Sequence, residues 1–139
     1  MLLHASCVAI GGQAVLLTGS SGAGKSDLAL RLIDSGAQLV SDDQTLLQRE
    51  KDGLWASAPA AIAGLFEIRH AGLVTMPFLA TAPVALYVEL TSPNETIERL
   101  PETGPVLLLD HPVQRLRLPG LAASSPAKIR AMLLYKRVE

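Results

Sequence analysis

The sequence contains very little cysteine, few aromatic residues and no long apolar run. Its single cysteine, Cys7, excludes an internal disulfide and a multi-cysteine metal site, and is typical of a reducing compartment. One Trp, two Tyr and two Phe leave a core of Leu, Ala, Val and Ile. No apolar stretch approaches the ~20 residues that span a bilayer. We therefore expect a cytoplasmic protein without a membrane segment.

An excess of charge of either sign is also missing, since the sequence has 12 Lys and Arg residues and 13 Asp and Glu residues. The Lys and Arg residues are scattered, so no basic patch predicts nucleic-acid binding. The opening Met-Leu-Leu-His lacks the charged region and long apolar core of a signal peptide. A length of 139 residues suits one domain, which buries roughly two-thirds of the surface of its unfolded chain. We expect a single α/β domain over residues 1–139.

The hydrophobic pattern predicts β-hairpins mixed with a few helices. Strands are predicted over residues 2–10, 13–18, 38–41, 45–50, 54–57, 84–90, 106–109 and 113–118, with strand pieces and loops over 58–81. Helices are predicted over 25–34, over a short segment that opens with Ser92-Pro93-Asn94-Glu95 and ends near Pro101, and from Ser125-Pro126 onward. This alternation favours a mixed sheet over a regular doubly wound one.

The clearest motif is G-S-S-G-A-G-K-S, a match to G-x-x-x-x-G-K-[ST] between a predicted strand and a predicted helix. It comprises Gly19, Ser20, Ser21, Gly22, Ala23, Gly24, Lys25 and Ser26. Its glycines let backbone N–H groups turn toward phosphate oxygens, and the helix start adds further donors and a partial positive charge. Lys25 is expected to reach the terminal phosphates and the Ser26 hydroxyl to bind Mg²⁺. The motif predicts nucleotide or phosphate binding, and it indicates little about the reaction.

Two adjacent acids, Asp42 and Asp43, end a predicted strand seventeen residues after Lys25. An acid at a strand end commonly holds Mg²⁺ in P-loop proteins. Consecutive strand residues point to opposite faces, so the two need not share a role. One carboxylate can assist the metal or the loop while the other takes a proton from an acceptor hydroxyl. A solvated turn before the next strand is the alternative interpretation.

Taken in order, four features resemble the catalytic domain of the HPr kinase/phosphorylase family, which phosphorylates a serine of the phosphocarrier protein HPr. They are His4, the run Leu-Leu-Thr-Gly-Ser-Ser-Gly-Ala-Gly-Lys-Ser at 16–26, the pair Asp42-Asp43, and Ala58-Pro59 followed by Leu-Phe-Glu-Ile-Arg at 65–69. The last is similar to the family's Leu-Leu-Glu-Ile-Arg-Gly. The resemblance spans most of the chain and is strongest from His4 to about Leu73.

This resemblance implies a fold related to phosphoenolpyruvate carboxykinase, ATP and Mg²⁺ as cofactors, an HPr-like partner and a hexameric assembly. It implies that Asp42 is the catalytic acid/base in both the kinase and the phosphorylase direction. It also implies that Lys25 and His4 are catalytic residues and that His4 is placed near the phosphates. By the same resemblance, Glu67 and Arg69 are expected to line the site, and Ser26, Asp43 and Glu67 are the implied metal ligands. Read without the family, Glu67 and Arg69 equally suit a surface ion pair on one strand face.

The sequence also departs from the family pattern. Met1 lies almost at the start of the catalytic domain, which resembles the short form found in alphaproteobacteria, without the extra N-terminal domain. His70 replaces the glycine after Glu-x-Arg, and Pro119-Gly120-Leu121-Ala122-Ala123 stands where the family has a loop with Gly-Arg-Asn. The following C-terminal helices are also cut short. The absent arginine favours kinase activity over the reverse reaction.

Two other functions stay open at this point. A small-molecule kinase would use the same loop, but the chain has no evident Arg-rich lid segment. A nucleotide-binding regulatory module would bind ATP without transferring phosphate, and the absent loop arginine and short tail are compatible with it. Outside the motifs, Asp110-His111 is interpreted as a strand-end turn and Cys7 as a small core residue.

Overall fold

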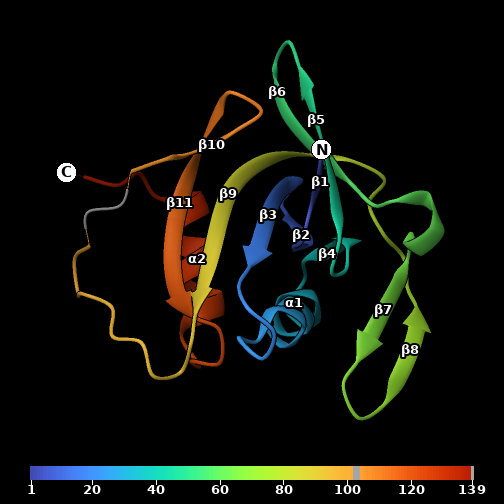
Figure 1. The fold of residues 1–139 in the computed structure, drawn as a ribbon, viewed down its shortest axis with the longest axis horizontal. Helices are drawn as coiled ribbons and strands as arrows, with labels where there is room; N and C mark the ends of the chain where they lie inside the picture. The colour runs from blue at the N-terminus through green and yellow to red at the C-terminus, as the bar shows by residue number, and fades with distance from the viewer. Residues whose placement is uncertain (102–103, 139) are drawn as a thin grey trace.

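The computed structural model describes residues 1–101 and 104–138. Over these residues two α-helices, α1 (Lys25–Asp34) and α2 (Ser125–Leu134), pack with a large sheet and a separate hairpin (Figure 1). The strands, in chain order, are β1 (Leu2–Leu3), β2 (Ser6–Ile10), β3 (Gln13–Thr18), β4 (Gln38–Ser41), β5 (Thr45–Glu50), β6 (Gly53–Ser57), β7 (Leu65–Ile68), β8 (Gly72–Thr75), β9 (Ala82–Thr91), β10 (Val106–Leu108) and β11 (His111–Pro119). A 3₁₀ turn, η1 (Ala60–Ile62), precedes β7.

The large sheet is mixed, as the sequence predicts. Its strands follow the order β1-β5-β6-β9-β3-β2-β4, and β9 also pairs with β11, which in turn pairs with β10. Strand β9 is parallel to β3 and to β11, whereas the other strand pairs of this sheet are antiparallel. Parallel strands end at the same edge of a sheet, so the carboxyl ends of β3, β9 and β11 come together where the glycine-rich loop begins.

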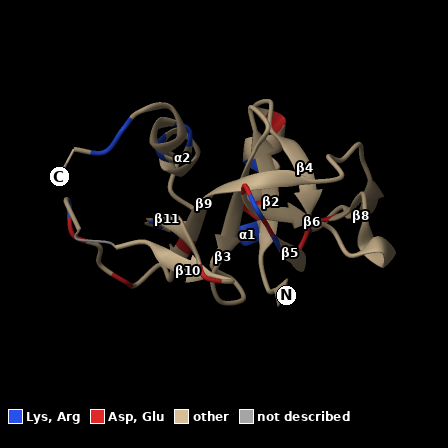
Figure 2. Ribbon diagram, turned by 90° about the horizontal axis from the view of Figure 1, so that it is seen from above, with Lys and Arg blue, Asp and Glu red and all other residues tan. Residues whose placement is uncertain are grey.

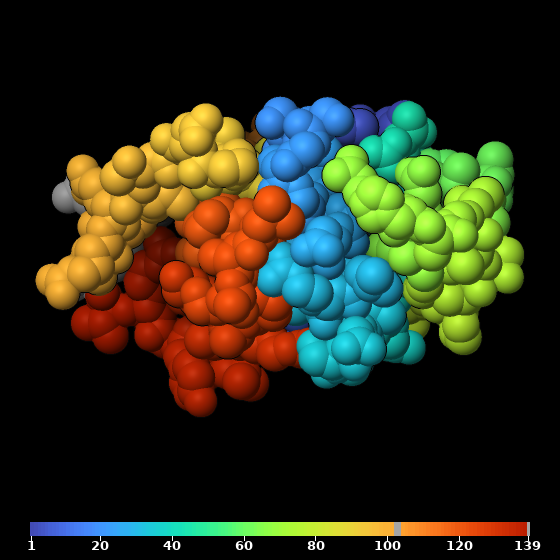
Figure 3. All heavy atoms as spheres, turned by 90° about the horizontal axis from the view of Figure 1, so that it is seen from below, coloured from blue at the N-terminus to red at the C-terminus, as the bar shows by residue number. Residues whose placement is uncertain are grey.

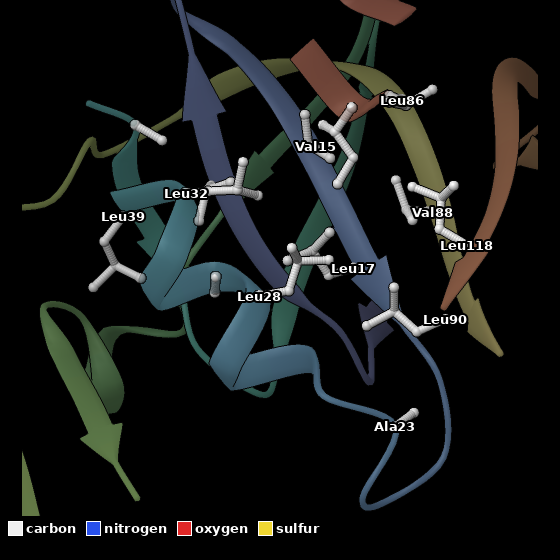
Figure 4. Close-up of a cluster of buried hydrophobic side chains, with 14 of the residues drawn as sticks. Val15, Leu17, Ala23, Leu28, Leu32, Leu39, Leu86, Val88, Leu90 and Leu118 are labelled. Carbon is white, nitrogen blue, oxygen red and sulfur yellow. The ribbon is translucent and has the colours of Figure 1, made fainter. Parts of the chain in front are cut away.

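Each face of the central strands is covered by different elements. Along β3, Val15 and Leu17 point into a cluster with both helices, whereas Ala14 and Leu16 point into a second cluster on the other face. The helix-side cluster also contains Leu28, Leu32, Leu86, Val88, Leu90 and Leu118 (Figure 4). Ile129 of α2 belongs to the same cluster. The second cluster includes Leu47 and Leu54 from the β5–β6 hairpin and Leu108 from β10. The sheet is therefore packed on both sides.

The β7–β8 hairpin forms a small sheet of its own beside α1 (Figure 1). Phe66, at 1% exposure, anchors it in the helix-side cluster, where Ile68 and Val74 add partly buried contacts. This confirms the strand pieces predicted over 58–81. The hairpin stands next to the start of α1, and it supplies one wall of the site described below.

Helix α2 covers the helix-side core through the residues that its sequence pattern predicts. Ile129 is fully buried, and Met132 and Leu133 are partly buried against the same cluster. Ser125 begins the helix and Pro126 occupies its first turn, where a missing N–H costs no helical hydrogen bond. The prediction of an amphipathic C-terminal helix is therefore confirmed.

We expect Ile129→Ala to lower the free energy of unfolding by about 2–5 kcal/mol, because it leaves a cavity in the core beneath α2. Leu134→Ala on the same helix is the matched control. Leu134 is 74% exposed, so its loss is expected to change stability by less than about 0.5 kcal/mol. Urea unfolding followed by circular dichroism measures both values. Equal losses in the two variants would contradict the placement of α2 on the core.

The prediction of a short helix that begins at Ser92 is wrong. The segment makes a single turn, closed by a hydrogen bond from the Glu95 amide to the Ser92 carbonyl (3.1 Å), and continues without helix. A short helix needs an apolar face to bury, since nucleation alone is unfavourable. Here Leu100 is 80% exposed, and Glu95 is held instead by an ion pair with Arg117 of β11. The segment therefore has the capping residues of a helix but no apolar face that packs against the core.

The continuous strand predicted over Leu2–Ile10 is interrupted at His4 and Ala5. Strand β1 pairs with β5, whereas β2 pairs with β3 and β4, so the chain changes partners at this bend. The two predicted hairpin turns, Gly11-Gly12 and Lys51-Asp52-Gly53, are confirmed. The turn between β10 and β11 is formed by Leu109 and Asp110. The interpretation of Asp110-His111 as a turn is therefore confirmed for Asp110 and wrong for His111, which begins β11.

Lys and Arg residues are dispersed over α1, α2, the hairpins and the C-terminal segment in the view of Figure 2. Three ion pairs join Glu89 and Glu95 to the arginines of β11. Cys7 is fully buried, and burial raises the pKa of its thiol well above the ordinary value, which supports its role as a core residue. Among the described helices, none is long and apolar enough to cross a bilayer.

Candidate active site

The glycine-rich loop connects β3 to α1, as the sequence predicts. Lys25 is the first residue of α1 and is nearly buried, and its Nζ donates a hydrogen bond to the Gly19 carbonyl at 2.8 Å. Gly24 precedes it with φ of 100°, a conformation that favours glycine. No side chain caps the helix at Gly24, so the first amides of α1 are available to a bound anion. The loop has the features of a phosphate-binding loop.

A cavity of about 540 Å³ lies over this loop. Its walls are the loop with the first turns of α1, the Asp43 side chain, residues 66–70 of the β7–β8 hairpin, and Leu121. In Figure 3 the loop lies between the hairpin on one side and the segment after β11 on the other. Segments far apart in the sequence therefore meet around the phosphate loop. The size suits a small ligand such as a nucleotide.

Asp42 is tied to three different parts of the site. Its Oδ1 accepts hydrogen bonds from the hydroxyls of Ser6 (3.0 Å) and Ser26 (3.3 Å), and its Oδ2 accepts one from the Glu67 amide (3.2 Å). These bonds link β2, the phosphate loop and the β7–β8 hairpin through one half-buried carboxylate. Both of its oxygens are already engaged as acceptors. The Asp42 carboxylate thus holds these three segments together by hydrogen bonds.

Asp43 has a different environment. Its side chain is 64% exposed and lines the cavity, and its Oδ1 lies 3.7 Å from His4 Nε2. Its backbone adopts φ of 68°, in the left-handed region that non-glycine residues seldom occupy, and its amide donates to Ser6 Oγ at 3.0 Å. Strained backbone of this kind tends to occur at functional sites. The two aspartates therefore have different surroundings, which is compatible with the expectation that they need not share a role.

The hairpin brings Glu67 and Arg69 to the cavity, but not on one strand face as expected. Strand β7 ends at Ile68, so Arg69 lies in the turn that follows, where His70 has φ of 72°. Both side chains are exposed and line the cavity, and no ion pair joins them in the described part of the chain. The alternative of a surface ion pair between them is therefore excluded.

Sequence reasoning missed Ser6, Leu30 and Leu121. Ser6 is fully buried in an apolar strand, and it both donates to Asp42 and accepts from the Asp43 amide. A lone serine within a buried strand is a usable signal, since a buried hydroxyl needs a partner. Leu30 and Leu121 contribute apolar surface to the cavity. Nothing in the sequence context of Leu30 separates it from ordinary hydrophobic residues. Leu121 lies in the stretch 119–123 that was compared above with the Gly-Arg-Asn loop of the family, but its own contact with the cavity was not predicted.

The loop between β11 and α2 touches the phosphate loop directly. Gly120 is buried, and a Cβ added to it would overlap the Ala23 carbonyl oxygen and lie 3.1 Å from Leu90 Cδ1. Leu121 lies beside Gly24, where an added Cβ would be 3.0 Å from Leu121 Cδ2. The segment without arginine at 119–123 therefore packs where the phosphate loop turns into α1.

We expect Gly120→Ala to displace the phosphate loop, because neither Ala23 backbone nor the β9 core can yield to the new methyl group. The clash is expected to cost about 1–3 kcal/mol of stability and to weaken nucleotide binding at least tenfold. Gly104→Ala is the control, since an added Cβ there meets nothing within 4 Å. Calorimetric titration with ATP measures the effect. Parent-like affinity in Gly120→Ala would contradict this contact.

The site has the donor types that a magnesium nucleotide requires. Mg²⁺ prefers oxygen ligands, usually one or two from the protein together with substrate phosphates and water. The Ser26 hydroxyl and the Asp42 carboxylate lie 3.3 Å apart beside the loop, and Asp43 and Glu67 line the same cavity. Over residues 1–101 and 104–138 no group of three His, Cys, Asp or Glu forms a metal cluster of its own. The oxygen donors around the loop fit a metal that is carried with phosphates.

Comparison with known proteins gives a consistent result. A family model described as the HPr Serine kinase C-terminal domain matches residues 1–129. The HPr kinase/phosphorylases of Geobacillus sp. (strain WCH70) and Lacticaseibacillus casei (strain BL23) are 37% and 31% identical over 128 residues, which cover 84% of this chain. The same alignments cover 41% and 40% of those proteins. The chain thus spans about two-fifths of the length of the curated relatives it matches.

The solved structure of the Hpr(Ser) kinase/phosphatase from Coxiella burnetii superposes with a TM-score of 0.83 at 27% identity. The match covers 96% of this chain and 88% of that one. It confirms the predicted α/β architecture, including the mixed sheet around the phosphate loop. The family resemblance identified in the sequence is also confirmed: the chain belongs to the HPr serine kinase C-terminal domain family.

Proposed function

We propose that this chain is an ATP-dependent protein kinase that phosphorylates a serine of an HPr-like phosphocarrier protein. The observation that carries the proposal is the arrangement of the two aspartates around the phosphate loop. Asp42 is bonded to Ser26, and Asp43 faces the same cavity from an exposed position. The names of the relatives, HPr kinase/phosphorylase, supply the acceptor. A cytoplasmic location is part of the proposal.

ATP bound with Mg²⁺ would supply the transferable γ-phosphoryl group and the charge that neutralises its oxygens. The loop amides and Lys25 would hold the β- and γ-phosphates, in keeping with the uncapped helix start. Ser26 and Asp42 would hold the metal, with Glu67 as a further candidate. Catalysis by these groups is positioning and electrostatic stabilisation, since phosphoryl transfer asks for little covalent chemistry.

The hydrogen bonds favour an exchange of the roles expected for the two aspartates. The sequence resemblance assigned the base to Asp42 and the metal to Asp43. Asp42 already accepts three hydrogen bonds, so a serine hydroxyl would have to displace existing donors to reach either of its oxygens. Asp43 is exposed in the cavity and has His4 beside it. We assign proton acceptance from the serine hydroxyl to Asp43, and metal and loop support to Asp42.

His4 and Arg69 would then act around that proton transfer. His4 lies 3.7 Å from Asp43 and can orient its carboxylate, which gives the residue a position that its sequence context alone did not. Arg69 lies in the turn at the cavity wall and offers a cation to phosphate oxygens. Both assignments are proposals that rest on proximity and charge.

We further propose that the forward reaction is faster than phosphorolysis of phosphoserine. The relatives' names include a phosphorylase activity. In this chain the loop beside Gly24 presents Leu121, which cannot bind an incoming phosphate. A homo-oligomeric assembly, as the sequence resemblance implies, is a separate proposal that size-exclusion chromatography with light scattering tests.

The experiment that tests the function is an assay of ADP formation with Mg²⁺ and ATP, with and without HPr. A kinase for this acceptor gives ADP formation that depends on HPr and stops when the acceptor serine is replaced by alanine. ADP formation with a small acceptor alone would favour a small-molecule kinase. Binding of ATP without ADP formation under any of these conditions would favour a regulatory module and contradict the proposal.

A further inference from the structure

Arg31 of α1 reaches from the helix to the loop between β11 and α2. Its Nη1 donates to the Ala122 carbonyl at 3.0 Å, and its Nη2 donates to the Gly120 carbonyl. Its Nε pairs with Asp27 Oδ2, one helical turn earlier, at 3.0 Å. All three nitrogens of the guanidinium are therefore engaged. The side chain is 30% exposed, and Arg31 does not line the cavity over the phosphate loop.

The loop that Arg31 holds is pressed against the phosphate loop. Buried Gly120 lies so close to the Ala23 carbonyl that no side chain fits between them. Leu121 packs beside Gly24, the residue that leads into α1. The far end of the loop is fixed by Ser125, whose hydroxyl donates to the Pro119 carbonyl. A shift of this segment would therefore change the support of Ala23 and Gly24.

We propose that Arg31 is a positioning residue for the phosphate loop, acting through the backbone of Gly120 and Ala122. The proposal deepens the kinase function proposed above and rests on it for its catalytic meaning. Arg31 clamps the segment 120–122 onto residues 23–24, and this contact keeps the loop amides in the arrangement that receives phosphate. Asp27, which lines the cavity, orients the guanidinium from the other side. The clamp thus couples the cavity wall to the loop beneath it.

Arginine suits this role for a geometric reason. The guanidinium is a rigid fork that can donate in several fixed directions at once, whereas a lysine ammonium is a single flexible donor group. Two carbonyls and one carboxylate accept from Arg31 in three directions. Lysine is therefore expected to preserve the charge near Asp27 without holding both carbonyls.

The structure offers a matched control on the neighbouring helix. Arg130 of α2 also bridges to α1, and its Nη2 donates to the carbonyls of Leu32 (3.2 Å) and Ser35 (3.3 Å). These acceptors lie at the opposite end of α1 from Gly24. Arg130→Ala therefore removes a comparable bridge between the helix and the C-terminal segment, and it leaves the support of the phosphate loop intact.

The test compares Arg31→Ala, Arg31→Lys and Arg130→Ala in the full chain, at a temperature where urea titration shows all of them folded. The dissociation constant of ATP with Mg²⁺ is measured by calorimetry. We expect Arg31→Ala to bind about tenfold more weakly than the parent, a loss comparable to one charge-assisted hydrogen bond, and Arg31→Lys to recover less than half of that loss. Arg130→Ala is expected to bind within about twofold of the parent.

A second readout needs no nucleotide and no catalysis. Two amides beside the contact are protected by hydrogen bonds, that of Ala23 to the Ser20 carbonyl (3.0 Å) and that of Leu28 to the Gly24 carbonyl (2.8 Å). Their hydrogen exchange is expected to be about tenfold faster in Arg31→Ala than in the parent, and unchanged in Arg130→Ala. If Arg31→Ala does not fold, Arg31→Lys decides the matter by the same two measurements. Parent-like affinity and exchange in the folded Arg31 variants would overturn the proposal. Failure of the parent to phosphorylate HPr would contradict the proposed function instead. The exchange measurement would still test the role of Arg31, because it does not depend on catalysis.

Discussion

Asp43→Asn is expected to lower phosphoryl transfer by about 10²–10⁴-fold, the usual contribution of a general base, while ATP binding stays close to that of the parent. Asp43 lines the cavity with an exposed carboxylate and makes one ion-pair contact, with His4, so its amide replacement disturbs few structural bonds. The measurement is the single-turnover rate with HPr, paired with the ATP dissociation constant. A parent-like rate would contradict the assignment of the base.

Asp42→Asn is the matched comparison because it makes the same chemical change one residue away. It is expected to weaken binding of ATP with Mg²⁺ and to destabilise the site, since one amide nitrogen replaces an oxygen that accepts a hydrogen bond. If Asp42→Asn instead kept full ATP affinity and lost transfer, while Asp43→Asn transferred normally, the base would be Asp42. The pair of variants therefore decides between the two assignments.

Lys25→Ala is expected to reduce transfer by about 10²–10³-fold and to weaken ATP binding as well. Lys25 is nearly buried at the start of α1, and its ammonium already lies at the mouth of the loop, bonded to the Gly19 carbonyl. Removing it takes away both a proposed phosphate ligand and the hydrogen bond from the lysine to the Gly19 carbonyl. Lys128→Ala, at an exposed position on α2, is the control and is expected to behave as the parent.

The same assay measures both lysine variants: initial rates at several ATP concentrations, which separate the KM from kcat. The expected result is a change in both constants for Lys25→Ala, because we propose that the lysine contacts phosphate in the ground state and in the transition state. An unchanged kcat/KM would mean that the loop does not hold a reacting phosphate. The chain would then have to use another cation in this role.

The parts of the fold that follow from local chemistry were predictable from the sequence. The Gly11-Gly12 and Asp52-Gly53 turns, the helix after Gly24 and the apolar strands all depend on short stretches of chain. The prediction of a helix at Ser92 was wrong because a local pattern alone does not decide whether a helix forms. Its capping residues were present, but the segment buries too little apolar surface for a helix to form.

The candidate site was predictable only in part. The phosphate loop and the aspartate pair are contiguous motifs, so their chemistry is visible in the sequence. The different environments of Asp42 and Asp43 arise from Ser6, Ser26 and the Glu67 amide, which meet only in the folded chain. Local sequence could not show which aspartate is engaged and which is exposed.

The contacts of Arg31 illustrate the same limit. A residue seven positions after Gly24 on a helix looks like an ordinary solvent-facing arginine with an Asp at i−4. Its carbonyl partners lie about ninety residues later in the chain, between β11 and α2. The sequence showed only that this loop, residues 119–123, has no arginine. The structure shows instead how the loop is held.

The measurement that tests the central proposal most directly is the intact mass of HPr after incubation with this chain, ATP and Mg²⁺, followed by peptide mapping. We expect a gain of one phosphoryl group on an HPr serine, and none when Lys25→Ala replaces the parent. Unchanged HPr, in a sample where calorimetry shows ATP bound to the folded chain, would contradict the proposal that the chain is a serine kinase for this acceptor.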